Sequence, residues 1–496
     1  MLGFEMTSAG RDKSDAADGL QKHDTNWWLH RINLASLISN LEENLIDRDK
    51  AVRIIKAMRS VEDASEKGEL PKFNTYIHFE PEILKRAGMD CSVMHVGRSS
   101  QDILATVEFG LNKERIAAAV EQIARIQKSL CDLAERESGK VVPAYTNGVQ
   151  ALPESYSHYI LAFARAFSRE TERFIQCFSR YDVCPMGAGV LNGTAWPLNR
   201  KRIADLLGFA APSENSFDAG QIAGNTLPLE LSQIVVSVMT LISEFLADFS
   251  AQYHHSYPWV VLDLSGSTYV SSAMPQKRNP GILNSCRTDA STLLGMSVEA
   301  AFRSHNIPAG MADGRLSGRM DIVPQATKVL SEFDRILNNL VIHPDRSLEE
   351  LNLDWTCSQE IADQLMKKYG IPFRVGHHFA SDVVTYARAN NITPADFSYE
   401  DAKTIYAKSV ADVAKEDPSI PKAFPMTAEE WKNAKDPVAI VHNRAVKGGP
   451  QPSELNKMIE MAKKDLANNE AWVASTENQL SQSEKKLNND FDQMLK

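Results

Sequence analysis

The chain has 496 residues, a net charge of −10 and 24% charged residues. An acidic protein of this kind is poorly suited to gripping the phosphates of nucleic acids, so we expect no nucleic-acid partner. No stretch reaches the roughly 18 consecutive apolar residues of a membrane-spanning helix, and the polar start lacks the apolar segment of a signal peptide. The composition therefore indicates a protein without membrane partners.

Six cysteines are spread through the chain without the spacing of a zinc site or a C-x-x-C motif. Their density is too low for a disulfide scaffold. We therefore expect reduced thiols in a cytoplasmic protein that holds no structural metal. The glycine-rich fingerprints G-x-x-x-x-G-K-S/T and G-x-G-x-x-G are also missing from the sequence, so we predict no nucleotide cofactor.

Apolar residues recur at helical spacing through most of the chain. The first long segment, residues 111–138, has apolar residues every three or four positions with charges between them. A second helix is expected over 153–177, with Pro153 in its first turn. Residues 227–249 are apolar on more than one face, which predicts burial in a bundle or a subunit interface. Residues 281–305 are another long helical candidate.

Long amphipathic helices bury their apolar faces by antiparallel packing at small crossing angles, so we predict an all-α protein with a central long-helix bundle. Residues 1–110 are expected to form an N-terminal helical domain, 111–353 the bundle domain, and 354–455 a C-terminal helical domain. Residues 456–496 are polar, with a thin apolar stripe. For these we predict a helical extension that is exposed to solvent.

The segment most informative about chemistry is residues 266–280, GSTYVSSAMPQKRNP, a run of polar and turn-forming residues between two predicted helices. Either Ser271 or Ser272 could act as a nucleophile or base if a positive charge stabilises its alkoxide. Lys277 can supply that charge, and backbone amides of a turn can add to it. Taken alone, such a pattern is more often an ordinary inter-helix loop with a helix cap.

The whole string S-S-A-M-P-Q-K-R-N-P, however, resembles the signature loop of the fumarase/aspartase superfamily, G-S-S-x-M-P-x-K-x-N-P, with Val270 at the leading glycine. Its Q-K pair is most similar to the argininosuccinate lyase branch. Other segments resemble that branch in the same order: 95–102 its H-T-G-R-S-R-N-D, 146–153 its T-H-L-Q-x-A-Q-P, 187–194 its G-x-G-A-L-A-G-T, and 361–374 its A-D-x-L and G-x-P-F-R stretch. The resemblance covers about residues 27–455.

This resemblance implies a three-domain, all-α, fumarase/aspartase-like fold and a homotetramer whose active sites are each shared among three subunits. It implies an elimination that releases fumarate from a succinyl compound without a cofactor or metal. By the same resemblance Ser271 is the base, and Lys277 and Asn279 bind the substrate and stabilise its charge. The positions that match the segments around the substrate are Arg98, Ser99, Ser100, Gln101, Thr146, Asn147, Ser272 and Met274.

The proton-relay histidine of the family is missing from this sequence. Its position in the T-H-L-Q segment is occupied by Asn147. His78 and His95 line up with family positions and are candidates for the acid, because histidine titrates near neutral pH. A lone histidine is more often structural, so the identity of the acid stays open.

The side of the site that receives the leaving group departs further from the family. Ser100 and Gln101 replace the second arginine and the asparagine of R-S-R-N-D, and residues 308–315 lack the tyrosine and glutamine of the branch. We therefore predict a carbon–nitrogen lyase that acts on an N-substituted aspartate other than argininosuccinate. The alternatives are a catalytically silent relative, an ordinary argininosuccinate lyase, and a cycloisomerase or other superfamily enzyme with a different leaving group.

Overall fold

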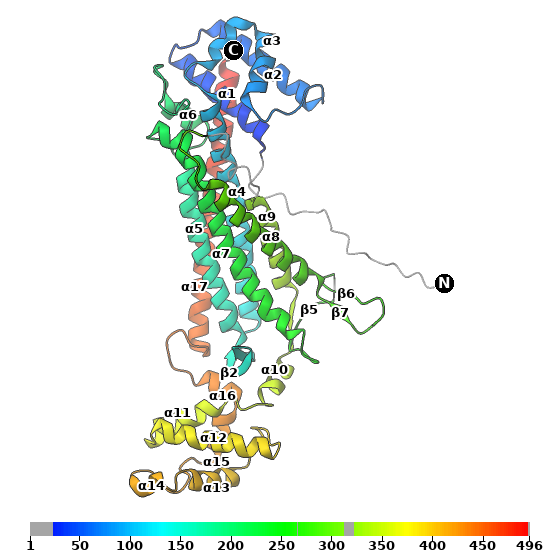
Figure 1. Ribbon diagram of the computed structural model, residues 1–496, viewed down its shortest axis with the longest axis vertical. Coiled ribbons are helices and arrows are strands. Elements are labelled where there is room, and N and C mark those ends of the chain that lie inside the picture. The colour runs from blue at the N-terminus through cyan, green and yellow to red at the C-terminus, as the bar shows by residue number, and fades with distance from the viewer. Residues whose placement is uncertain (1–22, 265, 312–321, 495–496) are drawn as a thin grey trace, which may run out of the picture.

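The computed structural model describes residues 23–264, 266–311 and 322–494. This part of the chain is built almost entirely from helices, joined by short two-stranded ribbons. Figure 1 shows an elongated molecule with short helices at both ends and long helices between them. The prediction of an all-α protein around a central long-helix bundle is confirmed.

Short helices from the first hundred residues form one end of the molecule (Figure 1). They are α1 (Thr25–Glu42), α2 (Arg48–Glu66), α3 (Tyr76–Ala87) and a 3-10 helix, η1 (Met89–His95). Asp24 and Asp47 cap α1 and α2, because each carboxylate accepts a hydrogen bond from a backbone amide of the first turn. α2 packs against both α3 and η1. These packed helices precede α4, the first long helix of the bundle.

The long helices of the middle section pack side by side. The bundle contains α4 (Ser100–Arg136), α5 (Tyr156–Tyr181), α7 (Ala223–Gln252), α8 (Gly281–Ser304) and α9 (Ile322–Asn338). α4 lies against α5 and α9, and α7 lies against α8. Ile123, Phe167, Ile242 and Phe333 belong to the shared core and are fully buried. Each long helix predicted from the sequence is present, with shifted ends.

The boundary predicted at residue 110 lies inside α4, which runs without a break from Ser100 to Arg136. The reason for a glycine there is packing. A Cβ atom on Gly110 would lie 2.5 Å from ring atoms of Trp28, so the glycine lets α1 approach α4 closely. This glycine therefore marks a helix–helix contact instead of a helix end.

Pro153 does not start a helix, contrary to the expectation from the sequence. It lies in β2 (Val149–Ser155), which pairs antiparallel with β1 (Val141–Thr146), and α5 begins after it at Tyr156. Pro153 is opposite Pro143 in this ribbon. Residues after α4 thus form a hairpin before the chain turns back into the bundle.

The C-terminal helix, α17 (Pro452–Met494), returns along the bundle against α4 and α5 and ends among the N-terminal helices (Figure 1). Its 43 residues correspond to a length of about 65 Å. Leu487 and Phe491 on this helix are buried in the main core, and Glu484 forms an ion pair with Arg31 of α1 at 3.0 Å. The structure therefore differs from the expected solvated helix, because the thin apolar stripe is packed.

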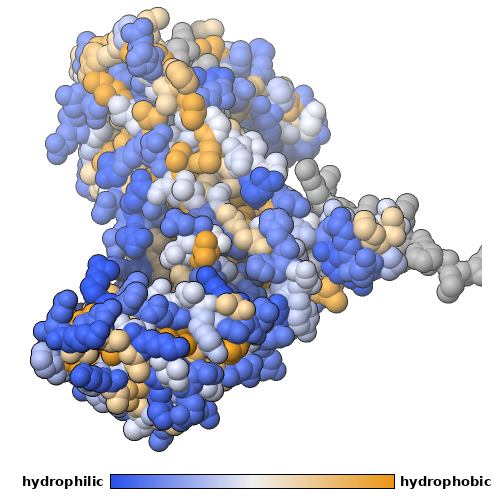
Figure 2. Space-filling view, turned by 60° about the horizontal axis from the view of Figure 1, so that its bottom comes forward, coloured by the Kyte–Doolittle hydropathy of each residue, from blue (hydrophilic) through white to orange (hydrophobic). Residues whose placement is uncertain are grey.

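The opposite end of the molecule has its own hydrophobic core, which includes Phe379, Tyr406 and Trp431. In Figure 2, where this end comes forward, hydrophilic residues cover most of its surface. The elements that build it are α10 (Pro344–Leu351), α11 (Ser358–Tyr369), α12 (Phe373–Ala389), α13 (Tyr399–Ser409), α14 (Val413–Glu416), α15 (Ala428–Lys435) and α16 (Pro437–His442).

The remaining elements are short connections along the bundle. β3 (Val183–Cys184) pairs parallel with β4 (Ala211–Pro212), and β5 (Val260–Leu262) pairs antiparallel with β8 (Leu340–Ile342). Two short helical segments, α6 (Arg200–Leu206) and the π-helix η2 (Asp218–Ile222), complete this part. The last ribbon, β6 (Tyr269–Val270) with β7 (Arg278–Asn279), stands out from the side of the bundle (Figure 1).

One helical stretch among the described residues, Asp218–Gln252, is long and apolar enough to cross a membrane by length and composition. The core helix of a soluble protein passes the same test. Val235, Met239 and Ile242 on this stretch are fully buried in the bundle. This stretch is therefore anchored in the protein core through one of its faces.

Candidate active site

The signature segment folds into a hairpin. Its strands, β6 and β7, pair Tyr269 with Asn279 and Val270 with Arg278. Beyond the strands, the Ser271 amide donates a hydrogen bond to the Lys277 carbonyl oxygen at 3.0 Å. These contacts fold the connecting loop back on itself and bring the backbone of Lys277 next to Ser271.

The hydroxyl oxygen of Ser271 accepts hydrogen bonds from two backbone amides, those of Ala273 at 3.4 Å and Met274 at 3.3 Å. Amides that point at an oxygen stabilise negative charge on it. Ser271 is half-buried, whereas the neighbouring Ser272 is exposed. Of the two serines, Ser271 is therefore the one whose hydroxyl oxygen faces backbone donors.

Lys277 and Met274 are exposed on the same loop. Among the described residues, none forms an ion pair with the Lys277 ammonium group, which leaves its charge available to an anion. The Asn279 side-chain amide donates a weak hydrogen bond to the Tyr269 carbonyl oxygen at 3.4 Å. The hairpin thus gathers a serine, a cation and an amide within one short segment.

A second group of candidate residues lies at the start of α4. The Ser99 side chain caps this helix in a capping box with Asp102, and the half-buried Ser100 and Gln101 form its first turn. Unpaired amides and the helix dipole make such an N-terminus favourable for a carboxylate.

Arg98, just before this helix, is directed into the protein. It is 7% exposed, and its guanidinium donates hydrogen bonds to the Asn33 side chain at 2.7 Å and the Tyr76 hydroxyl at 2.9 Å. This geometry differs from the direct substrate contact expected from the sequence. It suits an arginine that positions the start of α4.

Asp102 is a residue of the site region whose role the sequence analysis missed. Its buried carboxylate accepts backbone hydrogen bonds from Ser99 at 2.8 Å and from Gly187 and Gly189 at 3.0 Å each. Burial raises the pKa of Asp102 to about 6, although these hydrogen bonds act in the opposite direction. Both glycines have a positive φ angle, a conformation that glycine adopts most readily. The glycines of the segment 187–194 were therefore the feature of the sequence that could have indicated an unusual backbone conformation there.

The third group lies at the tip of the β1–β2 hairpin. Asn147 and Gly148 have φ angles of 52° and 76°, as in the tight two-residue turn for which Asn-Gly is preferred. Thr146 pairs with Val149 beside the turn, and Thr146 and Asn147 are both exposed. The residue at the position of the family's histidine therefore has a structural role in this hairpin.

These three groups lie far apart within one chain. Ser99 and Thr146 flank α4 at opposite ends, and the 37 residues of this helix correspond to about 55 Å. The β6–β7 hairpin projects from the side of the bundle between those ends (Figure 1). A site that uses all three groups therefore has to combine residues from different copies of the chain.

The two candidate histidines lie at the N-terminal end of the molecule. His78 is exposed on α3 and its Nδ1 lies 3.0 Å from the Thr75 hydroxyl. His95 has Nδ1 3.1 Å from the Tyr76 hydroxyl and 3.6 Å from a Glu80 carboxylate oxygen. The Tyr76 hydroxyl joins His95 to Arg98 in one network, which gives His95 a link to the start of α4 that His78 lacks.

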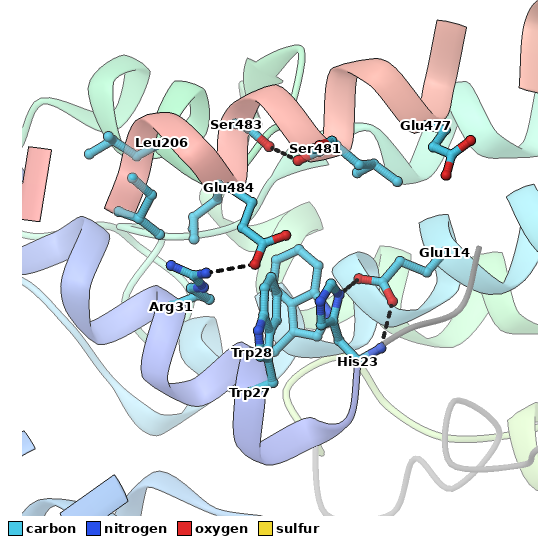
Figure 3. Close-up of a pocket in the computed structure, with 13 residues that line it drawn as sticks. His23, Trp27, Trp28, Arg31, Glu114, Leu206, Glu477, Ser481, Ser483 and Glu484 are labelled. Carbon is cyan, nitrogen blue, oxygen red and sulfur yellow. Dashed lines mark hydrogen bonds and ion pairs between the residues drawn. The ribbon is translucent and has the colours of Figure 1, made fainter. Parts of the chain in front are cut away.

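A cavity of about 100 Å³ lies elsewhere, between α1, α4 and α17 (Figure 3). The His23 ring stacks on Trp27 with 3.5 Å between ring centroids, and Glu114 bonds to both the backbone amide and the ring of His23. None of the candidate site residues lines this cavity. In the described part of the chain, no cluster of three His, Cys, Asp or Glu residues is arranged to hold a metal ion.

Comparisons with known proteins place these features in a family. The chain matches the family model described as "Lyase" over residues 35–295, and the model described as "Argininosuccinate lyase C-terminal" over residues 355–440. The argininosuccinate lyase of Methanoculleus marisnigri is 27% identical over 490 residues, which cover 95% of each chain. That of Pelotomaculum thermopropionicum is 27% identical over 394 residues, or 79% of this chain and 81% of the relative.

Solved structures share the fold. An EDDS lyase variant with bound fumarate has a TM-score of 0.85 at 22% identity, with 95% of this chain and 92% of that chain covered. A class II fumarase from Schistosoma mansoni has a TM-score of 0.62 at 14% identity, covering 88% and 94%. Because the first family model spans more than half of the sequence, the chain belongs to the lyase family of the fumarase/aspartase superfamily, and it carries an argininosuccinate lyase-type C-terminal domain.

Proposed function

We propose that this protein is a carbon–nitrogen lyase that removes an amine from an N-substituted aspartate and releases fumarate in a reversible reaction. The observation that carries this proposal is the pair of amides directed at the Ser271 hydroxyl oxygen. A serine is a weak base unless its alkoxide is stabilised, and we assign that stabilisation to these amides together with the Lys277 charge on the same loop.

In the proposed reaction the Ser271 alkoxide takes a proton from the carbon next to one carboxylate. The electron pair left behind is delocalised into that carboxylate, where Lys277 and Asn279 stabilise the added negative charge. The pair then forms the new carbon–carbon double bond as the carbon–nitrogen bond breaks. The amine leaves with the electron pair of the broken carbon–nitrogen bond and takes a proton from the general acid of the site, and fumarate remains.

The start of α4 is the proposed binding site for the second carboxylate of the substrate. The Ser99 hydroxyl and the backbone amides of the first turn offer donors there, and the helix dipole favours an anion. Ser100 and Gln101, which replace the arginine and asparagine of the argininosuccinate branch, are assigned to the leaving-group side of the site. We therefore propose a substrate other than argininosuccinate, with the same succinyl end and a different nitrogen substituent.

We also propose that the active form is a homotetramer whose sites combine residues of three subunits. The distance spanned by α4 supports this, because Ser99 and Thr146 cannot meet within one chain. Exposed apolar side chains along α8 support it too: Val298 is 56% exposed and Phe302 is 77% exposed. Apolar surface of this kind marks protein–protein contacts.

The test is an assay for fumarate with a panel of N-substituted aspartates, run in both directions. Replacing Ser271 with Ala should lower the rate by about 10²–10⁴-fold, the usual effect of losing a catalytic base. Ser179→Ala, on the exposed end of α5, is the matched control and should retain the wild-type rate. A Ser271→Ala variant that keeps more than about a tenth of the rate would refute the assignment of the base.

A folded wild-type protein that releases no fumarate from any member of the panel would favour the silent-relative alternative. Asn147 is the feature that supports this alternative, because an amide cannot relay a proton as a histidine does. The same assay therefore separates the two hypotheses.

A further inference from the structure

Tyr269 is a large side chain beside the proposed catalytic residues that the reaction above does not use. In the β6–β7 ribbon it is directly opposite Asn279. Residues opposite each other in an antiparallel pair project their side chains from the same face, with Cβ atoms about 5 Å apart. The Tyr269 ring and the Asn279 amide therefore occupy the same face of the hairpin.

Gly281, the first residue of α8, fixes where the ring lies. A Cβ atom at this position would be 3.1 Å from both Cδ1 and Cε1 of Tyr269, which is tighter than ordinary van der Waals contact. The ring thus rests across the start of α8 in the space left by the missing side chain. Gly281 has no positive φ angle, so contact with the ring explains this glycine better than backbone strain does.

The Tyr269 ring is open to solvent, and other large side chains of the hairpin are exposed as well. Tyr269 is 52% exposed and Met274, at the tip of the same loop, is 44% exposed. The proposed reaction assigns Ser271, Lys277 and Asn279 of this hairpin to the succinyl end, and it leaves the Tyr269 ring unassigned. An N-substituted aspartate has two carboxylates on its succinyl part, so an uncharged ring is complementary to the substituent on nitrogen instead.

We infer that Tyr269 determines the leaving group, and that the preferred substrate carries an apolar alkyl or arylmethyl substituent on its nitrogen. The ring forms one wall of the pocket for this substituent, and Gly281 holds the wall in place. This inference rests on the proposed function, because Asn279 must bind the succinyl end for the ring to face the nitrogen. Specificity of this kind is modest: a hydrophobic pocket discriminates by about 10–200-fold per methylene.

The experiment compares the affinities of N-benzylaspartate and N-methylaspartate, measured by calorimetry so that binding is separated from turnover. The wild type should bind the benzyl compound at least about tenfold more tightly. Tyr269→Ala should bring the two dissociation constants close together, whereas Tyr269→Phe should keep the preference because it keeps the ring. Tyr257→Ala, which removes a 66% exposed tyrosine outside the hairpin, is the control and should also keep it.

A second variant tests the role of Gly281. Gly281→Val should push the ring aside and weaken binding of the benzyl compound, and this effect should vanish in the Tyr269→Ala background because the two residues act through one contact. Independent effects of the two substitutions would overturn the inference. It would also be overturned if the benzyl preference persisted in Tyr269→Ala, if that preference were lost in Tyr269→Phe, or if the wild type bound neither compound.

Binding and turnover separate this inference from the proposed function. If the benzyl preference depends on Tyr269 but no fumarate is released, the proposed elimination is refuted, whereas contact between the Tyr269 ring and the nitrogen substituent is supported. If fumarate is released but the preference does not depend on Tyr269, the elimination is supported and the role of Tyr269 is refuted.

Discussion

Replacement of Asp102 by Asn tests whether this carboxyl group is buried and charged as the structure describes. The Asp102 carboxylate is fully buried and accepts backbone hydrogen bonds from Ser99, Gly187 and Gly189. Burial raises its pKa from 3.8 to about 6. Asparagine has nearly the same shape and still accepts at one oxygen, but it does not titrate.

The sign of the pH effect follows from the raised pKa. Between about pH 4 and pH 6 the folded protein keeps a proton on Asp102 that the unfolded chain has lost, so the free energy of unfolding falls as the pH rises. Each pH unit between the two pKa values corresponds to about 1.4 kcal/mol, and the full effect is about 3 kcal/mol. Above about pH 6 the effect is complete and constant.

The measurement is denaturant unfolding of wild type and Asp102→Asn at matched protein concentrations across this pH range. The difference between their unfolding free energies should shift by about 3 kcal/mol in favour of the Asn variant as the pH rises from 4 to 7. Asp132→Asn, at an exposed position of the same helix, is the control and should stay within about 0.5 kcal/mol of wild type. A difference that does not change with pH would contradict the burial of Asp102.

Other features of the chain offer independent tests. Light scattering at micromolar concentration should show a tetramer, and a stable monomer would refute the proposed sharing of sites. Gly110→Ala should lower the free energy of unfolding by about 1–3 kcal/mol in denaturant titrations, because its Cβ atom would lie 2.5 Å from the Trp28 ring. Argininosuccinate should be a poor substrate in steady-state assays; a kcat/KM of about 10⁴ M⁻¹s⁻¹ or more would mean that Ser100 and Gln101 are neutral replacements.

Local patterns were sufficient to predict the helices and the loop that carries the superfamily signature. The 3.6-residue periodicity places α4, α5, α7 and α8, because it depends on residues within a few turns of each other. The same holds for Ser271, whose amide partners are two and three residues further along the chain. The resemblance in this loop correctly indicated the superfamily.

Contacts between distant residues could not be predicted in the same way. Asp102 meets glycines that are 85 and 87 positions away, and Gly110 serves a contact with Trp28 of another helix. Periodicity also cannot show where a helix packs, which is why the path of α17 along the bundle was not foreseen. Pro153 misled for a related reason: its strand exists only because β1 is there to pair with it.

The family residues that this chain keeps lie close together in the fold, whereas the positions at which it departs from the family lie far apart. Ser271, Lys277 and Asn279 form a unit that one hairpin holds together, so the proposed proton abstraction depends little on the rest of the fold. The positions at which the chain departs from the family form no such unit, because Asn147 and Gln101 lie at opposite ends of α4. Substitutions there leave the hairpin undisturbed. A chain of this family can therefore keep the first step while residues on the leaving-group side change one at a time, as we propose for Ser100 and Gln101.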